Sequence, residues 1–331
     1  MIVFKRCLCY CVGMKFIGRL IKDMLVFGFL LGLIYMGGEF VTQYIDPGFS
    51  AVFPTTTSSA VQTAVPQQQL VFDASMYPYY DQLNDTQKVL YSQMYTSVEN
   101  MTPSFDVQDE VTKTDIETVY RCLTCDHPEL FWLSNKYNYQ YMESTGRIVS
   151  VTLQFNETAD DIDASKNAFT QACNQILVGA LQYDNEYDKE KYVHDALVEN
   201  ITYDINADLN QSAYSGMVNH RTVCAGYARS FQYLMQQLNI PCYYVIGTSE
   251  GEDHAWNIVL IDGSFYNVDV TWDACSKEND PYYFFNLDDA AFDVYHTRAS
   301  LSTSLPNCTS TLLAHKEDSD LYQRIRFTIP K

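Results

Sequence analysis

The sequence predicts an α+β protein in which helices pack on an antiparallel sheet. From residue 158 onward, helical patterns come first and short apolar segments of strand length follow, so helices and strands are segregated along the chain. Asp262-Gly263 separates two of these segments and is a strong signal for a two-residue hairpin. Before residue 158, a shorter set of helical and strand patterns predicts a second, smaller α+β module.

The composition indicates a globular protein with an acidic surface. The chain has 331 residues, of which 47% are hydrophobic and 19% are charged, and its formal net charge is −20. This length is enough for one large or two small domains with a real core. Nucleic acid binding needs cationic patches, so the acidic balance argues against a nucleic acid partner.

Residues 1–45 are predicted to be a cytoplasmic stretch followed by a membrane segment. Residues 24–36 form an unbroken apolar run, with basic residues before it and none after it until Lys88. This asymmetry places the N-terminus in the cytoplasm and the rest of the chain outside. Two fates stay open: a single-pass anchor in the cell membrane, or secretion after signal cleavage. No A-x-A-like cleavage site follows Met36, which favours the anchor.

Three regions are expected after the membrane segment. Residues 46–75 are rich in Pro, Thr, Ser and Gln and are predicted to be an extended linker. The small α+β accessory module is predicted at 76–157, with helices at 84–99 and 115–125 and strands at 131–141 and 147–155. The main domain is predicted at 158–331. Its expected elements are helices at 160–182, 189–200 and 224–238, a loop at 204–218, and strands at 242–247, 254–261 and 264–270.

The predicted hairpin brings a histidine and an aspartate together. If the turn is at residues 262–263, paired residues place His254 opposite Thr271. Residues two apart on a strand share a face, so His254 and Asp269 project to the same side of the sheet. They lie one diagonal apart, about 7–8 Å between backbones, which side chains can bridge. The hairpin thus supplies an imidazole and a carboxylate to orient it.

Cys224 stands where the helix at 224–238 is expected to begin. The partial positive charge of a helix start favours a thiolate, and its free backbone N–H groups can stabilise an oxyanion. Alone, such a cysteine is most often structural, but the joint pattern favours catalysis. We expect Cys224 to attack an acyl carbon, His254 to take and return the proton, and Asp269 to fix the ring tautomer. The resulting thioester is resolved by water or by an amine.

Four further residues are expected at the substrate site. Trp256 and Trp272 flank the histidine and aspartate and are expected to exclude water and position the substrate, with core packing as the alternative. Gly226 has no side chain to crowd an approaching substrate. Tyr203 is expected to line the cleft.

The cysteines that follow the apolar run indicate no metal or cofactor. For Cys7, Cys9 and Cys11, which precede it, metal binding and acylation stay open beside simple apolar packing near the membrane. Seven of the ten follow the apolar run, and in an oxidising compartment they allow up to three disulfides and one remaining thiol. Cys122-x-x-Cys125 has the spacing of a redox pair, but no thioredoxin-like pattern surrounds it, and it lacks the second pair that a zinc site needs. No calcium-binding loop is visible.

The segments TVCAGYARSFQYLMQQLNIPCYYVIG and DHAWNIVLIDGSFYNVDVTWD together resemble the core of the transglutaminase-like superfamily. More narrowly, they are similar to bacterial members that are membrane-anchored or secreted. The resemblance covers about residues 190–275, and residues 126–133 and 282–298 also resemble flanking parts of the family. It implies a papain-like fold with Cys224, His254 and Asp269 as the catalytic triad.

The site and the resemblance together predict an extracytoplasmic cysteine enzyme. We expect it to hydrolyse peptide, isopeptide or amide bonds through a thioester, with a protein or peptide substrate such as a cell-wall or surface protein. Protein-glutamine transamidation is an alternative, because it shares the thioester and passes the acyl group to an amine. A non-catalytic surface interaction module that keeps the fold is a second alternative, against which the intact triad argues.

Overall fold

The computed structural model describes residues 49–52, 70–278 and 280–314. The predicted membrane segment at 24–36 lies outside these residues, and so does most of the predicted linker. None of the helices within the described ranges is both long enough and apolar enough to span a bilayer. The linker prediction needs one correction, because Phe49–Val52 forms a strand, β1, that pairs with another strand of the chain.

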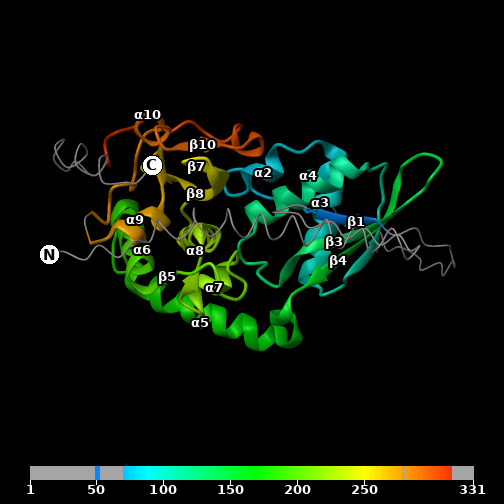
Figure 1. Ribbon diagram of the computed structural model, residues 1–331, viewed down its shortest axis with the longest axis horizontal. Coiled ribbons are helices and arrows are strands. Elements are labelled where there is room, and N and C mark those ends of the chain that lie inside the picture. Colours follow the sequence, from blue (N-terminus) through cyan, green and yellow to red (C-terminus); the bar gives the residue numbers. More distant parts are fainter. Residues whose placement is uncertain (1–48, 53–69, 279, 315–331) are drawn as a thin grey trace, which may run out of the picture. The chain divides into compact units, whose positions relative to one another are not determined.

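The first sheet is built around the antiparallel pair β3 and β4, with its strands in the order β1-β3-β4-β2 (Figure 1). Its other strands are β2 (Ser104–Asp106), β3 (Leu133–Tyr141) and β4 (Ile148–Phe155). Three helices belong to the same part of the chain: α2 (Pro78–Asp81), α3 (Asp85–Glu99) and α4 (Lys113–Asp126). The predicted pattern of two helices followed by two strands is therefore present, with β2 as an added short edge strand.

Reciprocal caps set where α3 and α4 begin. The Asn84 side chain accepts a hydrogen bond from the backbone N–H of Gln87, whose side chain accepts one from the backbone of Asn84. Thr112 and Asp115 form the same capping box at α4. The first helix begins at Asp85, one residue after its predicted bound, because Asn84 is its N-cap. The second helix begins at Lys113, two residues earlier than predicted, because Thr112 caps it.

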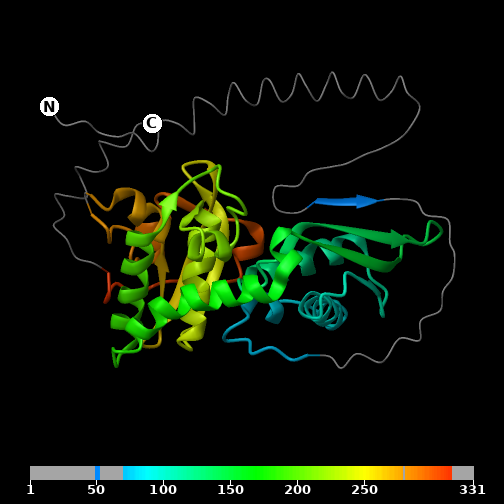
Figure 2. The same ribbon diagram turned by 90° about the horizontal axis from the view of Figure 1, so that it is seen from below.

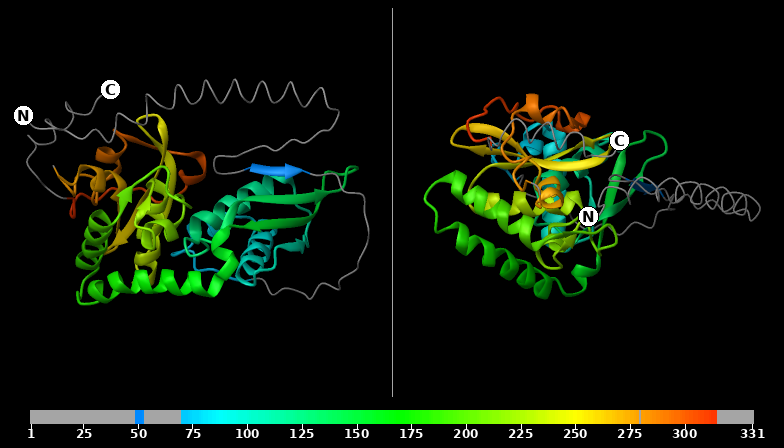
Figure 3. Two further views of the ribbon diagram at one scale, coloured as in Figure 1. Left: turned by 60° about the horizontal axis from the view of Figure 1, so that its bottom comes forward. Right: turned by 60° about the vertical axis from the view of Figure 1, so that its left-hand side comes forward.

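The second sheet has the strand order β10-β7-β8-β9, and α8 packs against β7 and β8. Its strands are β7 (Cys242–Ser249), β8 (Glu252–Ile261), β9 (Ser264–Val268) and β10 (His296–Arg298). The helices before it are α5 (Ile162–Ala180), preceded by the 3₁₀ turn η1 (Glu157–Asp161), α6 (Glu186–Asn200) and α8 (Cys224–Gln237). The two sheets lie toward opposite ends of the described chain, and α5 runs alongside both (Figures 2 and 3). The helix-before-sheet order matches the prediction.

The hairpin register is as predicted. Asp262 and Gly263 both have positive φ, at 48° and 78°, as the two central residues of a type I′ turn require. Pairing then runs from Ile261 opposite Ser264 to Asn257 opposite Val268. A register shift of one residue would have moved every side chain to the other face.

The end of this hairpin differs from the prediction. Strand β9 stops at Val268 instead of continuing to residue 270, and α9 (Val270–Ser276) begins immediately afterwards. Asp269 is the N-cap of α9, and its side chain accepts hydrogen bonds from the backbone N–H groups of Thr271 and Trp272. These caps end the strand, because they stabilise helical backbone where strand pairing would otherwise continue.

Several short elements were not predicted. The segment expected to be a loop at 204–218 contains the one-turn helix α7 (Ala213–Met217). Strands β5 (Thr202–Tyr203) and β6 (Arg221–Thr222) pair in parallel on either side of it. The helix α10 (Asp289–Phe292) and the 3₁₀ turn η2 (Ser300–Ser302) accompany β10. Such elements are too short to show a period in the sequence.

Buried hydrogen bonds join the two sheet regions. The Tyr79 hydroxyl donates to the carbonyl of Tyr244 on β7 at 2.6 Å. From α8, the Gln232 side chain donates to the carbonyl of Cys125 at the end of α4, at 2.8 Å. The end of α4 is therefore fixed against the helix that begins with Cys224.

Candidate functional site

Cys224 is the first residue of α8, where the sequence predicts a helix start. The N-cap residue, Val223, makes no side-chain cap, and no acidic residue lies in the first turn. The chain enters the helix along Asn210, whose carbonyl accepts hydrogen bonds from the Thr222 hydroxyl and the Val223 N–H. Cys224 is half-buried. Its thiol therefore lies at the positive end of a helix dipole, beside N–H groups that a developing oxyanion can use.

His254 and Asp269 are in direct contact. The Nε2 atom of His254 lies 2.6 Å from Oδ2 of Asp269. Asp269 is completely buried, and the His254 side chain is only 9% exposed. The two carboxylate oxygens of Asp269 have different tasks: Oδ1 caps α9, and Oδ2 faces the imidazole. The aspartate thus reaches the ring from a helix cap, not from the strand position that the sequence predicts.

His296 is a third member of this cluster, and the sequence analysis missed it. Its Nε2 atom lies 3.0 Å from the same Oδ2 of Asp269, and the side chain is fully buried. It comes from β10 and stacks on Phe292 at 3.9 Å between ring centroids. The available signal was weak: His296 is one of six histidines, in a segment that resembles a flank of the family.

The charges of the cluster support one another. Burial alone lowers the pKa of His254, but the charge and hydrogen bond of Asp269, together with a hydrogen bond to Cys224, raise it to about 10. Burial alone raises the pKa of Asp269, but the His254 charge and the hydrogen bonds of His254 and His296 hold it below its usual value. Near neutral pH the cluster is therefore an imidazolium ion held on a carboxylate, with a sulfur as its other neighbour.

The orientation of the His254 ring follows from these contacts. Its Nε2 is engaged by Asp269, so Nδ1 is the ring atom left for Cys224. An imidazolium beside a sulfur favours the thiolate form, which is the nucleophilic one. Such an arrangement can attack an acyl carbon and return a proton to the leaving group.

The same cluster contains side chains of the kinds that bind metal ions. His254, Asp269 and His296 each offer one ligand atom, and these atoms lie within 4.8 Å of one another. Both Nε2 atoms, however, lie at hydrogen-bond distance from a single carboxylate oxygen, and the other oxygen caps α9. Two N–H donors that share one acceptor account for the spacing without a cation.

The two predicted tryptophans lie beside His254 in different ways. Trp256 is 1% exposed, stacks on His254 with an interplanar angle of 21°, and donates its N–H to Asn267. Its position fits the core-packing alternative, because it supports the imidazole from inside the protein. Trp272 is half-buried and meets His254 edge-on, with ring centroids 6.3 Å apart. Of the two, Trp272 has the exposure that a wall of the substrate site requires.

Tyr203 and Gly226 both lie near Thr222, two residues before the start of α8. Tyr203 is half-buried on β5 and pairs with Thr222, two residues before Cys224. Gly226 is buried and faces the protein: a Cβ there would lie 1.8 Å from the Thr222 hydroxyl and 2.9 Å from the Ser212 carbonyl. The prediction that Gly226 leaves room for a substrate is therefore corrected, because the space is needed by the chain that leads into the helix.

Gly226→Ala is expected to destabilise the protein by about 1–3 kcal/mol, because the added methyl group must displace Thr222, whose hydroxyl is tied to Asn210. Since Cys224 directly follows this segment, reactivity of its thiol is expected to fall too. Urea unfolding and the rate of thiol alkylation measure the two effects. An unchanged free energy of unfolding would contradict the close approach.

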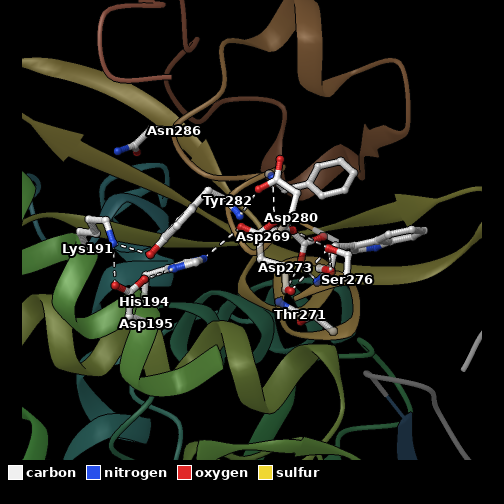
Figure 4. Close-up of polar contacts among 12 residues, drawn as sticks. Lys191, His194, Asp195, Asp269, Thr271, Asp273, Ser276, Asp280, Tyr282 and Asn286 are labelled. Atoms are coloured by element: carbon white, nitrogen blue, oxygen red, sulfur yellow. Dashed lines mark hydrogen bonds and ion pairs between the residues drawn. The ribbon is translucent and has the colours of Figure 1, made fainter. Parts of the chain in front are cut away.

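A polar cluster between α6 and α9 holds Asp269 in place (Figure 4). Asp273, one turn after Asp269, accepts a hydrogen bond from the Phe284 N–H at 2.8 Å and lies 3.0 Å from Nε2 of His194. The Asp269 N–H in turn donates to the Phe284 carbonyl. On the other side, His194 and Lys191 contact Asp195. Asp269 and Asp273 are therefore both hydrogen-bonded to the backbone of Phe284.

The side-chain carboxyl of Glu190, also on α6, should make the stability of the protein depend on pH. It is fully buried, Oε2 accepts a hydrogen bond from Asn286 at 2.8 Å, and Oε1 has no partner among the described residues. Burial, opposed by this bond and by the charge of His194, raises the pKa of Glu190 from 4.5 to about 8. The folded protein holds the proton more tightly than the unfolded chain, so the free energy of unfolding falls as pH rises through this range.

Glu190→Gln is expected to remove the loss of stability that ionisation of Glu190 causes at alkaline pH, since the amide stays neutral at every pH. At pH 9 the variant should be more stable than the wild type by on the order of a few kcal/mol. Urea unfolding at pH 5 and pH 9 measures the difference. Glu199→Gln is the matched control, because this residue lies on the same helix with its side chain 70% exposed. Equal wild-type stability at both pH values would contradict the buried titration.

The sequence allows disulfides, but six cysteines are thiols in the structure. They are Cys122, Cys125, Cys173, Cys224, Cys242 and Cys308. Cys122 and Cys125 are buried on α4, and burial raises the pKa of each thiol, to about 12 for Cys125. A redox role for this pair gains no support, because a reactive thiol needs exposure and a lowered pKa.

Comparisons with known proteins agree with the geometry. Residues 175–270, which include Cys224, His254 and Asp269, match the profile of the transglutaminase-like superfamily. The chain is similar to kyphoscoliosis peptidase of Mus musculus, with 25% identity over 130 residues, and of Homo sapiens, with 26% over 152 residues. These matches cover 34% and 40% of this chain, and 20% and 23% of the relatives, so the chain spans less than a quarter of their length.

Among solved structures, the chain is similar to a TGase with 16% identity and a TM-score of 0.29, over 51% of this chain and 50% of that one. The matched profile, the curated relatives and the mixed α+β architecture are mutually consistent. The transglutaminase-like resemblance of this chain is therefore carried by residues 175–270.

Proposed function

We propose that this chain is a cysteine enzyme that hydrolyses peptide, isopeptide or other amide bonds through a thioester on Cys224. The observation that carries the proposal is the placement of His254. Its Nε2 is held on a buried carboxylate, and its other nitrogen is left for the thiol at the start of α8. This is the arrangement that nucleophilic catalysis by cysteine needs: a nucleophile, a base and a group that orients the base.

The first half of the reaction forms the thioester. The Sγ atom of Cys224 bonds to the carbonyl carbon, and the negative charge moves to the carbonyl oxygen, where the N–H groups at the start of α8 stabilise it. The C–N bond then breaks, and the imidazolium of His254 gives its proton to the leaving amine. Asp269 keeps the ring oriented during the transfer.

The second half releases the product. The neutral imidazole of His254 takes a proton from water, and the resulting hydroxide attacks the thioester carbon. The C–S bond breaks, a carboxylic acid leaves, and the thiolate–imidazolium pair is restored. Trp272 beside the ring is suited to limit the access of bulk water.

A protein or peptide substrate is proposed on two grounds. Members of the superfamily act on protein substrates, and the curated relatives are called peptidases. The similarity covers a small part of those relatives, so their whole activity is not transferred to this chain. The proposed substrate is a protein exposed at the cell surface, such as a cell-wall protein.

Competitive thiol labelling tests the proposal. Cys275 is exposed and supplies a reference within the same molecule. With iodoacetamide near pH 7, Cys224 is expected to react faster than Cys275 although it is less accessible, because the imidazolium favours its thiolate. His254→Gln should remove this advantage. A wild-type Cys224 that reacts more slowly than Cys275 would contradict the enzyme and favour a non-catalytic interaction module.

Hydrolysis and transamidation are separated by their products. The enzyme is incubated with a glutamine-bearing peptide and a lysine-bearing peptide, and the products are analysed by mass spectrometry. Hydrolysis gives peptide fragments or a deamidated glutamine. A joined product that has lost one ammonia would instead assign the chain to glutamine–lysine cross-linking, through the same thioester.

A location outside the cytoplasm is proposed for the catalytic domain. The support is the distribution of basic residues, which precede the apolar run at 24–36 and are absent after it until Lys88. Protease treatment of intact cells that express the full chain tests this location. Digestion of the domain in intact cells is expected, and digestion only after lysis would contradict it.

A further inference from the structure

A cavity of about 340 Å³ lies where the end of α4 approaches α8 and β7. Its walls come from α4 and the segment after it, from the loop at 209–212, and from β7. Most of the wall is apolar, with Leu130, Phe131 and Ile246 among the lining side chains. The volume is sufficient for one or two amino acid side chains, and the substrate role proposed above does not use it.

The charged groups of this cavity all have one sign. Arg121 from α4 and Arg229 from α8 both line it, and no aspartate or glutamate does so. This is unusual in a chain whose formal net charge is −20. Neither arginine forms an ion pair with an acidic side chain within the ranges that the structure describes. The cavity is thus a local positive site on an acidic protein.

The two guanidinium groups line the cavity together with Cys125 and are held differently. Burial raises the pKa of the Cys125 thiol to about 12, and the charges of Arg229 and Arg121 oppose this rise. Arg229 is fixed by a hydrogen bond to the Gln211 carbonyl at 2.7 Å and by its position 4.4 Å above the Tyr244 ring. Arg121 is less engaged: its Nε is buried and has no partner among the described residues.

Asn210 links the cavity to the start of α8. Asn210, which lines it, also accepts the hydrogen bonds that guide residues 222 and 223 into α8. Cys224 directly follows Val223, so the chain neighbour of the thiol is hydrogen-bonded to a residue of the cavity wall.

We propose that this cavity binds a carboxylate of the peptide substrate, with Arg121 as the recognising residue and Arg229 as a fixed second charge. A guanidinium presents several N–H donors in a plane that matches a carboxylate, and apolar walls strengthen the attraction by excluding water. The carboxylate comes either from the C-terminus of the substrate or from an acidic side chain near the scissile bond. The role as a specificity site rests on the function proposed above, whereas the binding itself does not.

Four random pentapeptide libraries, each labelled with a fluorophore, test this inference. They combine a free or amidated C-terminus with glutamate or glutamine at the central position. Binding to the full chain carrying Cys224→Ala is measured by fluorescence polarisation, so that no turnover occurs. At least one carboxylate is expected to strengthen binding about 10-fold to 100-fold over the amidated glutamine library. The library that gains identifies the source of the carboxylate.

Variants on α4 supply the controls. Arg121→Gln is expected to abolish the preference for carboxylates, and Arg121→Lys to keep part of it, because a charge remains. Lys113→Gln removes the same charge from an exposed site on the same helix and should keep the full preference. Thermal unfolding of each variant shows that it is folded. Equal binding of all four libraries, or a preference that survives Arg121→Gln, would overturn the inference.

Turnover by the wild type separates this inference from the proposed function. An active enzyme whose kcat/KM is the same for all four libraries would contradict the carboxylate site and leave the enzyme in place. Carboxylate-selective binding by a wild-type chain without turnover would contradict the enzyme and leave the site in place.

Discussion

Cys224→Ala is expected to abolish peptide turnover while the protein keeps its fold. In the proposed mechanism the sulfur of Cys224 is the only protein atom that bonds to the substrate, so no other group of the protein replaces it. Loss of the nucleophile from a comparable catalytic unit lowers kcat on the order of a millionfold. The side chain is half-buried at a helix start, where alanine is well tolerated, and unfolding should change little. Turnover of a peptide library and circular dichroism measure the two expectations.

Cys275→Ala is the matched control for this experiment. It removes an exposed cysteine that lies outside the proposed site. This variant is expected to retain wild-type turnover. Comparable activity in Cys224→Ala and the wild type would show that the thioester mechanism is wrong, whatever the fate of the control.

Asp269→Asn is expected to lower kcat about 10⁴-fold, as in other triads whose orienting carboxylate becomes an amide. The structure gives a specific reason. The amide oxygen must remain the acceptor for the N–H groups of Thr271 and Trp272, so the amide nitrogen faces His254 and His296. The N–H groups of the amide then face the N–H groups of the two histidines, and the His254 imidazole loses its acceptor and its orientation.

The same change should shift the pH dependence. The charge of Asp269 is the largest of the causes that raise the pKa of His254 to about 10, and burial, which lowers it, remains. The wild type is expected to keep its imidazolium, and its activity, up to about pH 10. In Asp269→Asn the alkaline loss of residual activity should begin at markedly lower pH. A profile of kcat against pH measures it.

The free energy of unfolding of the wild type should also fall at alkaline pH. Because the folded-state pKa of His254 exceeds its ordinary value of 6.5, its contribution is complete below pH 6.5 and is lost as pH rises through about 10. Asp161→Asn is a matched control, since Asp161 also caps a helix, α5, but lies outside the cluster around His254. An unchanged alkaline limit in Asp269→Asn would contradict the assigned role of the carboxylate.

The hairpin that carries His254 could be predicted from the sequence because local chemistry determines it. The turn at Asp262 and Gly263 needs two residues with positive φ, and such a pair sets the register of the strands on both sides. The start of α8 was equally accessible, since fourteen residues of helical apolar spacing precede the stop at Asn239.

The rest of the site depends on contacts between distant segments. Seven residues that begin with Val and Thr do not distinguish a short helix from the end of a strand, so the cap at Asp269 was read as strand. His296 lies 27 residues beyond Asp269, on a strand of three residues that only the completed sheet defines. The cavity at Arg121 and Arg229 requires α4 to be placed against α8, which no local pattern encodes.

The two carboxylate oxygens of Asp269 have separate tasks, so a substitution at this position must satisfy two independent requirements. One oxygen builds a helix, and the other serves an imidazole pair. Glutamate is too long to do both, and serine or threonine, which cap helices well, carry no charge for the ring. A library of all amino acids at this codon, sorted once for abundance and once for turnover, should therefore lose nearly every replacement in the second sort while retaining the capping residues in the first.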